Sequence, residues 1–93
     1  MKFDETRAQA LSLMRGAYDL HMHPAPSHTR RIADDFEAAR QANEVHMAGL
    51  VIKNHYEPTA ARAAIANKYA QTETRLSGSI ALNYPEGGLN PYA

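Results

Sequence analysis

The sequence predicts an α/β fold built from parallel βαβ units. Helix-like and strand-like segments alternate along the chain, which is the pattern of such units. The segment "LVI", at residues 50–52, is apolar at every position, as expected for a strand buried on both faces of a parallel sheet. The 93 residues suffice for a single α/β segment, residues 1–93, and no linker-like stretch predicts a second domain.

The first expected elements are a helix and a strand. Asp4 is a suitable N-cap and Gly16 a suitable C-cap for a helix of about three turns. Residues 17–23, "AYDLHMH", alternate between polar and apolar side chains, which is typical of a strand. Pro24 and Pro26 are expected to end this strand, because proline cannot donate a ladder hydrogen bond.

The second helix is predicted to begin at Asp34. Glu37 follows three residues later, and the two acids form a capping-box pattern. Gly49 is expected to end this helix. Residues 50–55, "LVIKNH", then form the second strand.

The third helix is expected to start near Thr59 and to run through the alanine-rich segment that follows. Residues 75–84 are predicted to be the third strand, weakened by Gly78. Asn90 and Pro91 have the pattern of a further helix start.

Three parallel strands without a following helix leave an open edge and an uncovered face. We therefore expect the N-terminal segment of a larger α/β barrel, truncated after the third strand. Another chain, copies of this chain or further residues would complete it, and a homo-oligomer or a second chain is the expected partner. The alternative is a small, complete three-stranded domain that ends in a turn.

Composition narrows the function classes. Lys and Arg number 10 and Asp and Glu number 10, so no net charge favours nucleic acid or an anionic membrane. The absence of cysteine excludes disulfides and thiolate metal sites and fits a reducing compartment. Charged residues interrupt the apolar positions near the N-terminus, so neither a signal peptide nor a membrane span is predicted there. The expected location is the cytoplasm.

The first strand carries the strongest candidate site. Asp19, His21 and His23 share one face of the strand, and the Cα atoms of the two histidines should be about 7 Å apart. Two imidazoles at this spacing can converge on one metal ion, and Asp19 could orient one of them. The alternative is a pair of hydrogen-bonded histidines at a strand end.

The second strand adds Lys53 and His55 on the corresponding face. If the strands are parallel neighbours, these side chains lie beside the two histidines, at the strand ends where α/β folds place their active sites. Lys53 has three interpretations: a counter-ion to Asp19, a donor to a substrate anion or a carbamylated metal ligand. The alternative is a lysine that extends its charge into solvent.

The loop after the third strand carries weaker signals. Asn83 lies near it, Gly87 and Gly88 permit close approach of a ligand, and the N–H groups before Asn90 could hold an oxyanion or phosphate. An ordinary turn is the alternative.

Residues His28, Arg30 and Arg31, in the loop after the first strand, could close over a substrate or could be solvated. His46 is expected to be a surface residue late in the second helix.

The segments "YDLHMHPAPS", "GLVIKNHYEPTAARA" and "GSIALNYPEGGLNP" together resemble the N-terminal part of metal-dependent hydrolases of the amidohydrolase superfamily. The resemblance is to a poorly characterised branch with DLHxH, KNHxxPT and GGLNP motifs. It implies a TIM-type (β/α)₈ barrel and a divalent metal centre that activates water to cleave an amide, ester or phosphoester. His21 and His23 match the ligand pair, and Lys53 and His55 match positions of metal or substrate contact.

A similar strand-end pattern occurs in the polymerase-and-histidinol-phosphatase family. The superfamily's later histidine ligands and its acidic proton shuttle have no counterpart in these residues.

The expected function is therefore that of a metal-dependent hydrolase acting on a small molecule. His21, His23 and His55 would hold zinc, or manganese or iron, and Asp19 and Lys53 would assist catalysis. The alternatives are a non-catalytic subunit that completes a barrel with a partner, and a metal-dependent phosphoesterase.

Overall fold

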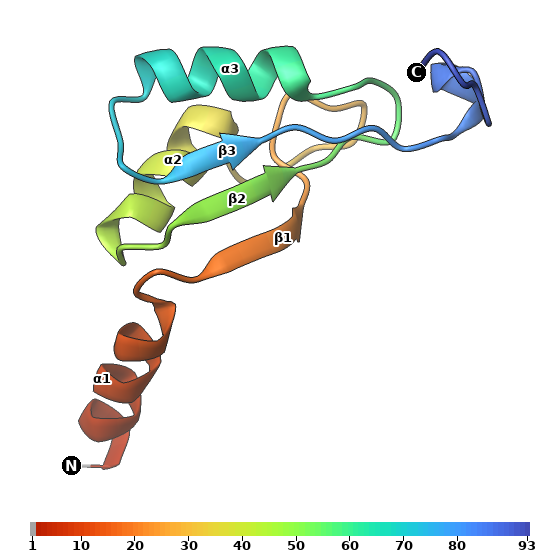
Figure 1. The fold of residues 1–93 in the computed structure, drawn as a ribbon. Helices are drawn as coiled ribbons and strands as arrows, with labels where there is room; N and C mark the ends of the chain where they lie inside the picture. Colours follow the sequence, from red (N-terminus) through yellow and green to blue (C-terminus); the bar gives the residue numbers. More distant parts are fainter. Residues whose placement is uncertain (1) are drawn as a thin grey trace.

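The computed structural model describes residues 2–93 and has the predicted α/β organisation (Figure 1). No helix in this part of the chain is long and apolar enough to cross a bilayer. In chain order the elements are α1 (Lys2–Met14), β1 (Tyr18–Met22), α2 (Asp35–Glu44), β2 (Gly49–Ile52), α3 (Ala60–Tyr69), β3 (Arg75–Ser77) and the short 3₁₀ helix η1 (Tyr84–Glu86).

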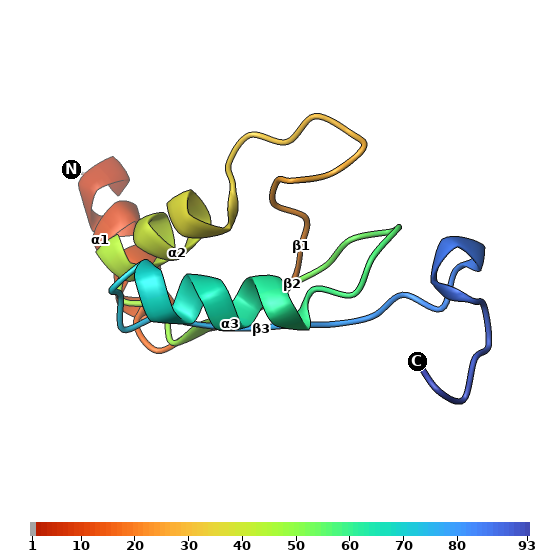
Figure 2. The ribbon, with the colours of Figure 1, turned by 90° about the horizontal axis from the view of Figure 1, so that it is seen from above.

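The three strands form one parallel sheet in the order β1-β2-β3. Leu50 of β2 pairs with Asp19 on one side and with Leu76 on the other, so all three strands run in register through their first residues. Helices α2 and α3 pack on the same side of the sheet, and no helix covers the other face within the described chain (Figures 1 and 2). The predicted βαβ arrangement is confirmed.

The core lies between the sheet and these two helices. Leu50, Ile52 and Leu76 point from the strands toward the helices, and the side chain of Ile52 is fully buried. The helices contribute small side chains, which let their backbones approach the strands closely. These are Ala38, Ala39 and Ala42 of α2, Ala63 and Ala66 of α3, and Ala70 at the end of α3.

Helix α1 was expected from the sequence, but it buries no residue. It extends away from the sheet at the start of β1 (Figure 1). Phe3, Leu11 and Leu13 are exposed on it. Its end is tied to the body of the fold by one backbone hydrogen bond, from Gly16 N to His46 O at 2.8 Å.

The capping box at the start of α2 is confirmed. The Asp34 carboxylate accepts from Glu37 N at 2.7 Å, and the Glu37 carboxylate accepts from Asp34 N at 3.2 Å. The predicted end of this helix at Gly49 is wrong, because α2 ends at Glu44 and His46 takes a left-handed conformation with φ 61°. Gly49 instead begins β2, where a Cβ atom would lie 2.8 Å from the Tyr18 ring.

Strand β3 is shorter than the predicted 75–84, because the chain leaves the sheet at Gly78. A Cβ atom at Gly78 would lie 2.4 Å from the Cα atom of Ala60, so the backbone there passes directly against the start of α3. At the helix-start pattern of Asn90 and Pro91, Tyr92 N donates to Asn90 Oδ1 at 2.9 Å and Ala93 N donates to Asn90 O at 3.1 Å, as at the beginning of a helix, and residues 91–92 form a turn. Asn90 N donates to Gly88 O at 2.8 Å.

The capping box gives a direct test of the local fold. Replacing Asp34 with Ala removes the acceptor for Glu37 N, and we expect the free energy of unfolding to fall by about 1 kcal/mol in urea denaturation. Asp34→Asn keeps a side-chain oxygen at the N-cap and should retain most of the stability. Equal stability of Asp34→Ala and the wild type would contradict the capping role.

Candidate functional site

The site is centred on two histidines at the C-terminal end of β1. The Nε2 atoms of His21 and His23 face each other at 3.1 Å. A neutral imidazole carries one N–H and one free lone pair, so the contact can be a hydrogen bond when one ring donates and the other accepts. At the same separation, the two Nε2 atoms could also bind one metal ion placed between them.

His55 follows β2 and lies against this pair. Its ring stacks on the ring of His23, with centroids 4.8 Å apart and planes tilted by 16°. Backbone pairing explains the proximity, because Lys53 N donates to Met22 O at 2.8 Å and holds the segment after β2 beside the end of β1. The structure thus brings together the histidines of the two predicted motifs.

The geometry suits two ligands of one ion. Nitrogens about 2.0–2.1 Å from a tetrahedral zinc ion lie about 3.3 Å from each other, close to the separation of the two Nε2 atoms. His55 is stacked on the ring of His23. Among residues 2–93, no three His, Cys, Asp or Glu side chains form a group that could hold a metal ion. His21 and His23 therefore fit as a ligand pair that needs further ligands.

Asp19 lies close to the pair but does not orient an imidazole. Its Oδ1 atom accepts a hydrogen bond from the backbone N–H of His21 at 3.0 Å. The pairing of β1 with β2 is irregular between Asp19 and Met22, and a short acidic side chain can satisfy a backbone N–H two residues along the chain. The predicted carboxylate–imidazole contact is therefore replaced by a contact to the backbone.

Lys53 is half-buried and does not pair with Asp19. The ion pairs found within the described chain both involve Arg62. The interpretation of Lys53 as a counter-ion to Asp19 is therefore wrong for this structure. The Asp19 carboxylate instead turns back onto its own strand. The Lys53 ammonium remains a positive charge close to the histidines.

The electrostatic environment of His23 is positive. Burial lowers the pKa of the His23 imidazole below its ordinary value of 6.5. Neighbouring positive charges lower this pKa further, because they disfavour a protonated ring. In decreasing order of effect, these charges come from His55, Arg31, His21 and Lys53.

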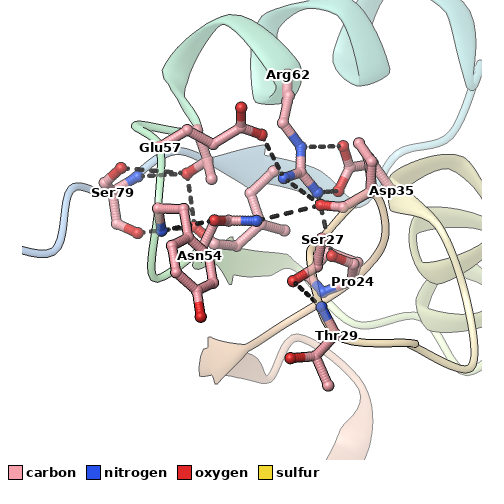
Figure 3. A network of polar contacts seen from close by, with 12 residues as sticks. Pro24, Ser27, Thr29, Asp35, Asn54, Glu57, Arg62 and Ser79 are labelled. Carbon is pink, nitrogen blue, oxygen red and sulfur yellow. Dashed lines mark hydrogen bonds and ion pairs between the residues drawn. The ribbon is translucent and has the colours of Figure 1, made fainter. Parts of the chain in front are cut away.

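A polar network anchors the loops that carry the site (Figure 3). The guanidinium of Arg62, on α3, forms a two-pronged ion pair with Asp35 at the start of α2, with both N···O distances 2.9 Å. Its other N–H groups donate to Pro24 O at 3.2 Å, to Pro26 O at 3.0 Å and to Glu57 Oε1 at 3.1 Å. The hydrogen bond with Asp35 raises the pKa of Arg62 further, so this side chain is always charged.

A second part of the network holds the end of β2. Thr59 is fully buried, and its hydroxyl donates to Ile52 O at 2.7 Å and accepts from Ser79 N at 2.8 Å. Asn54 donates to Pro26 O at 3.1 Å. The sequence indicates Thr59 as a helix start, which is confirmed, but neither its buried hydrogen bonds nor the roles of Arg62 and Asp35 are predicted. One signal was present, because Thr59 begins the stripe of small buried residues on α3 and Arg62 borders that stripe.

The loop after β3 reaches the site through Asn83, whose Nδ2 atom donates to His55 O at 3.1 Å. The two glycines serve the loop itself. Gly87 N donates to Tyr84 O at 3.0 Å, and Gly88 N donates to Asn83 O at 2.8 Å. The N–H groups of Gly87 and Gly88 are therefore engaged within the loop, which favours the alternative of an ordinary turn over an oxyanion site.

The remaining histidines lie outside the pair. The His28 ring meets the Tyr56 ring edge-on, with centroids 4.2 Å apart. His46 is exposed, as expected, although it lies just after α2 and not within it.

The ion pair of Arg62 predicts different effects for its two acidic partners. Asp35→Ala should lower the free energy of unfolding by about 3–5 kcal/mol in urea denaturation, because it leaves a mostly buried guanidinium with the exposed Glu57 as its sole ion-pair partner within the described chain. Glu57→Ala removes the exposed partner of the same guanidinium and should cost less than about 1 kcal/mol. Similar losses for the two variants would contradict the anchoring role of Asp35.

The lowered pKa of His23 predicts acid sensitivity of the metal-free protein. The folded state favours the neutral ring, so the unfolded state binds more protons once the pH falls below 6.5. Stability should therefore fall as the pH decreases through the folded pKa of His23. We expect the urea midpoint, measured with a chelator between about pH 7.5 and about pH 5, to fall less in His23→Gln than in the wild type. His46→Asn, a matched control, should follow the wild type, and an unchanged slope in His23→Gln would refute the assignment.

Comparisons with known proteins place the chain in a family. Residues 16–93, which include all three strands and exclude α1, match the profile of a family of unknown function, DUF6282. Searches of curated proteins and of solved structures gave no significant match. The chain therefore belongs to the DUF6282 family.

Proposed function

We propose that the protein is a metal-dependent hydrolase of the amidohydrolase type. The observation that carries the proposal is the 3.1 Å approach of the His21 and His23 Nε2 atoms at the C-terminal end of a parallel strand. Catalytic groups in parallel α/β folds lie at this edge of the sheet. The resemblance to the amidohydrolase superfamily supports the same assignment, because His21 and His23 match the metal-ligand pair of that superfamily.

The larger architecture that we propose is a (β/α)₈ barrel in which β1, β2 and β3 are neighbouring strands. Two features support it. The face of the sheet opposite α2 and α3 is uncovered within the described chain (Figure 1). Met22 packs against the core on the helix side, so strand alternation directs the neighbouring His21 to the uncovered face. Strand β1 lies at an edge of the sheet, and its Tyr18 and Leu20 side chains are 67% and 66% exposed. Further strands, from a second chain or from copies of this one, would cover these surfaces.

The residues of this chain take distinct parts in the proposal. His21 and His23 bind a divalent ion, zinc in the first instance and manganese or iron as alternatives. When bound, such an ion supplies Lewis acidity, which activates water and polarises a carbonyl or phosphoryl oxygen. Lys53, as a half-buried positive charge, stabilises negative charge that develops on the substrate. His55 fixes the ring plane of His23 by stacking on it.

A second candidate is a non-catalytic subunit that docks onto a partner. The exposed apolar side chains of α1 and of the β1 edge favour it, because exposed apolar surface of this extent marks interaction sites. In that case the histidines would hold no metal, and the isolated protein would assemble with itself or with its partner.

Metal analysis separates the two candidates. After incubation with zinc and removal of free ions, the wild type should retain about one zinc ion per chain, and His21→Ala or His23→Ala should retain none. His46→Asn alters an exposed histidine near the start of β1, at the opposite end of the strand from the histidine pair, and should bind zinc like the wild type. One-to-one zinc in either Ala variant would contradict the ligand assignment. A zinc-free wild type that assembles into oligomers would favour the second candidate.

A further inference from the structure

A pocket of about 590 Å³ opens beside the histidine pair. It lies between the end of β1 and the loop that leads to α2. Its polar lining combines the two imidazoles with two guanidinium groups and one amide, and it contains no Asp or Glu side chain. These polar residues are His21, His23, Arg30, Arg31 and Gln41.

Two residues of this lining, His23 and Arg31, have a buried polar atom without a hydrogen-bond partner within the described chain, and Arg31 is the one with a permanent charge. Its Nε atom is buried and has no hydrogen-bond partner within the described chain. Arg62 shows the usual solution, since acceptors surround its guanidinium on every side. An unpaired buried donor on a charged group is costly, which points to an acceptor that binds in the pocket.

The acidic side chains close to this pocket are committed elsewhere. Asp19 accepts from the backbone of His21, Asp34 caps α2, and Asp35 pairs with Arg62. None of these carboxylates forms an ion pair with Arg31 within the described chain. The positive charges of Arg30 and Arg31 therefore favour a negatively charged ligand in the pocket.

The loop that carries Arg31 is held in place, so the guanidinium is positioned in advance. Ala25 N donates to Ala33 O at 2.8 Å and closes the loop at its base. Thr29 N donates to Ser27 Oγ at 3.3 Å, and Arg62 binds the carbonyls of Pro24 and Pro26 (Figure 3). Preorganised donors bind a ligand without a large ordering cost.

We propose that this pocket binds an oxyanion of the substrate, a carboxylate or a phosphate. Arg31 is the principal donor and Arg30 adds positive charge. A guanidinium can bind either oxyanion through two parallel hydrogen bonds, which also fixes the orientation of the substrate. The inference deepens the proposed function and rests on it, because the bond to be cleaved would then lie at His21 and His23. The substrate class is thus a small molecule with an anionic group next to the scissile bond.

Calorimetric titration of the chelator-treated protein tests the pocket without metal. The probes are inorganic phosphate and, separately, acetate. We expect Arg31→Gln to weaken binding of the preferred probe by about tenfold or more, because it removes a charge-assisted pair of hydrogen bonds. Arg40→Gln makes the same charge change at an exposed residue of α2 that does not line the pocket, and it should bind like the wild type. The probe that binds more tightly identifies the oxyanion as phosphate or carboxylate.

Arg31→Lys keeps the charge but loses the two-pronged geometry, and it should bind more weakly than the wild type and more tightly than Arg31→Gln. If Arg31→Gln fails to fold, Arg31→Lys is the variant that tests the role of Arg31 in oxyanion binding. Affinities in the Arg31 variants equal to those of the wild type, or no binding of either probe, would overturn the inference. Zinc retention is measured in parallel. If the protein binds zinc but Arg31 does not affect oxyanion binding, the proposed function stands and the oxyanion pocket is refuted. If oxyanion binding depends on Arg31 but the protein binds no zinc, the pocket stands and the proposed function is refuted.

Discussion

The Arg62 guanidinium is the interaction on which the arrangement of the site depends. It joins α3 to the start of α2 through Asp35 and binds the carbonyls of Pro24 and Pro26 directly after the strand-end histidines (Figure 3). The core contributes mostly alanine from the helices, so it offers limited apolar burial to fix these loops. The Arg62 guanidinium has every N–H group matched to an acceptor, and displacement of the loop would remove the acceptors at Pro24 and Pro26.

The site is electropositive. Positive or potentially positive groups surround His23, whereas the nearby carboxylates are used in a helix cap, an ion pair and a strand contact. A divalent ion at the histidines would add to the positive charge, and an anionic substrate would balance it. The proposed metal site and the proposed oxyanion pocket are therefore complementary parts of one centre.

Much of the fold could be predicted from local sequence signals. The parallel βαβ order follows from periodicity, and the start of α2 follows from the Asp34–Glu37 pattern. The close approaches at Gly49 and Gly78 could not be predicted, because they depend on which side chain or backbone the tertiary fold brings opposite each glycine. The length of β3 differs from the prediction because the chain leaves the sheet at Gly78, and α2 ends before Gly49 because His46 takes a left-handed conformation.

The candidate site was predictable only in part, for a related reason. Strand alternation and the parallel order place His21, His23 and His55 together, and these are properties of sequence spacing. The partner of Asp19 depends on an irregularity in strand pairing, and the partners of Arg62 lie on three separate segments. X-ray absorption at the zinc edge of the zinc-loaded protein tests the central claim most directly. We expect two imidazole nitrogens at about 2.0–2.1 Å from the ion, and a shell of oxygen ligands without imidazole would contradict it.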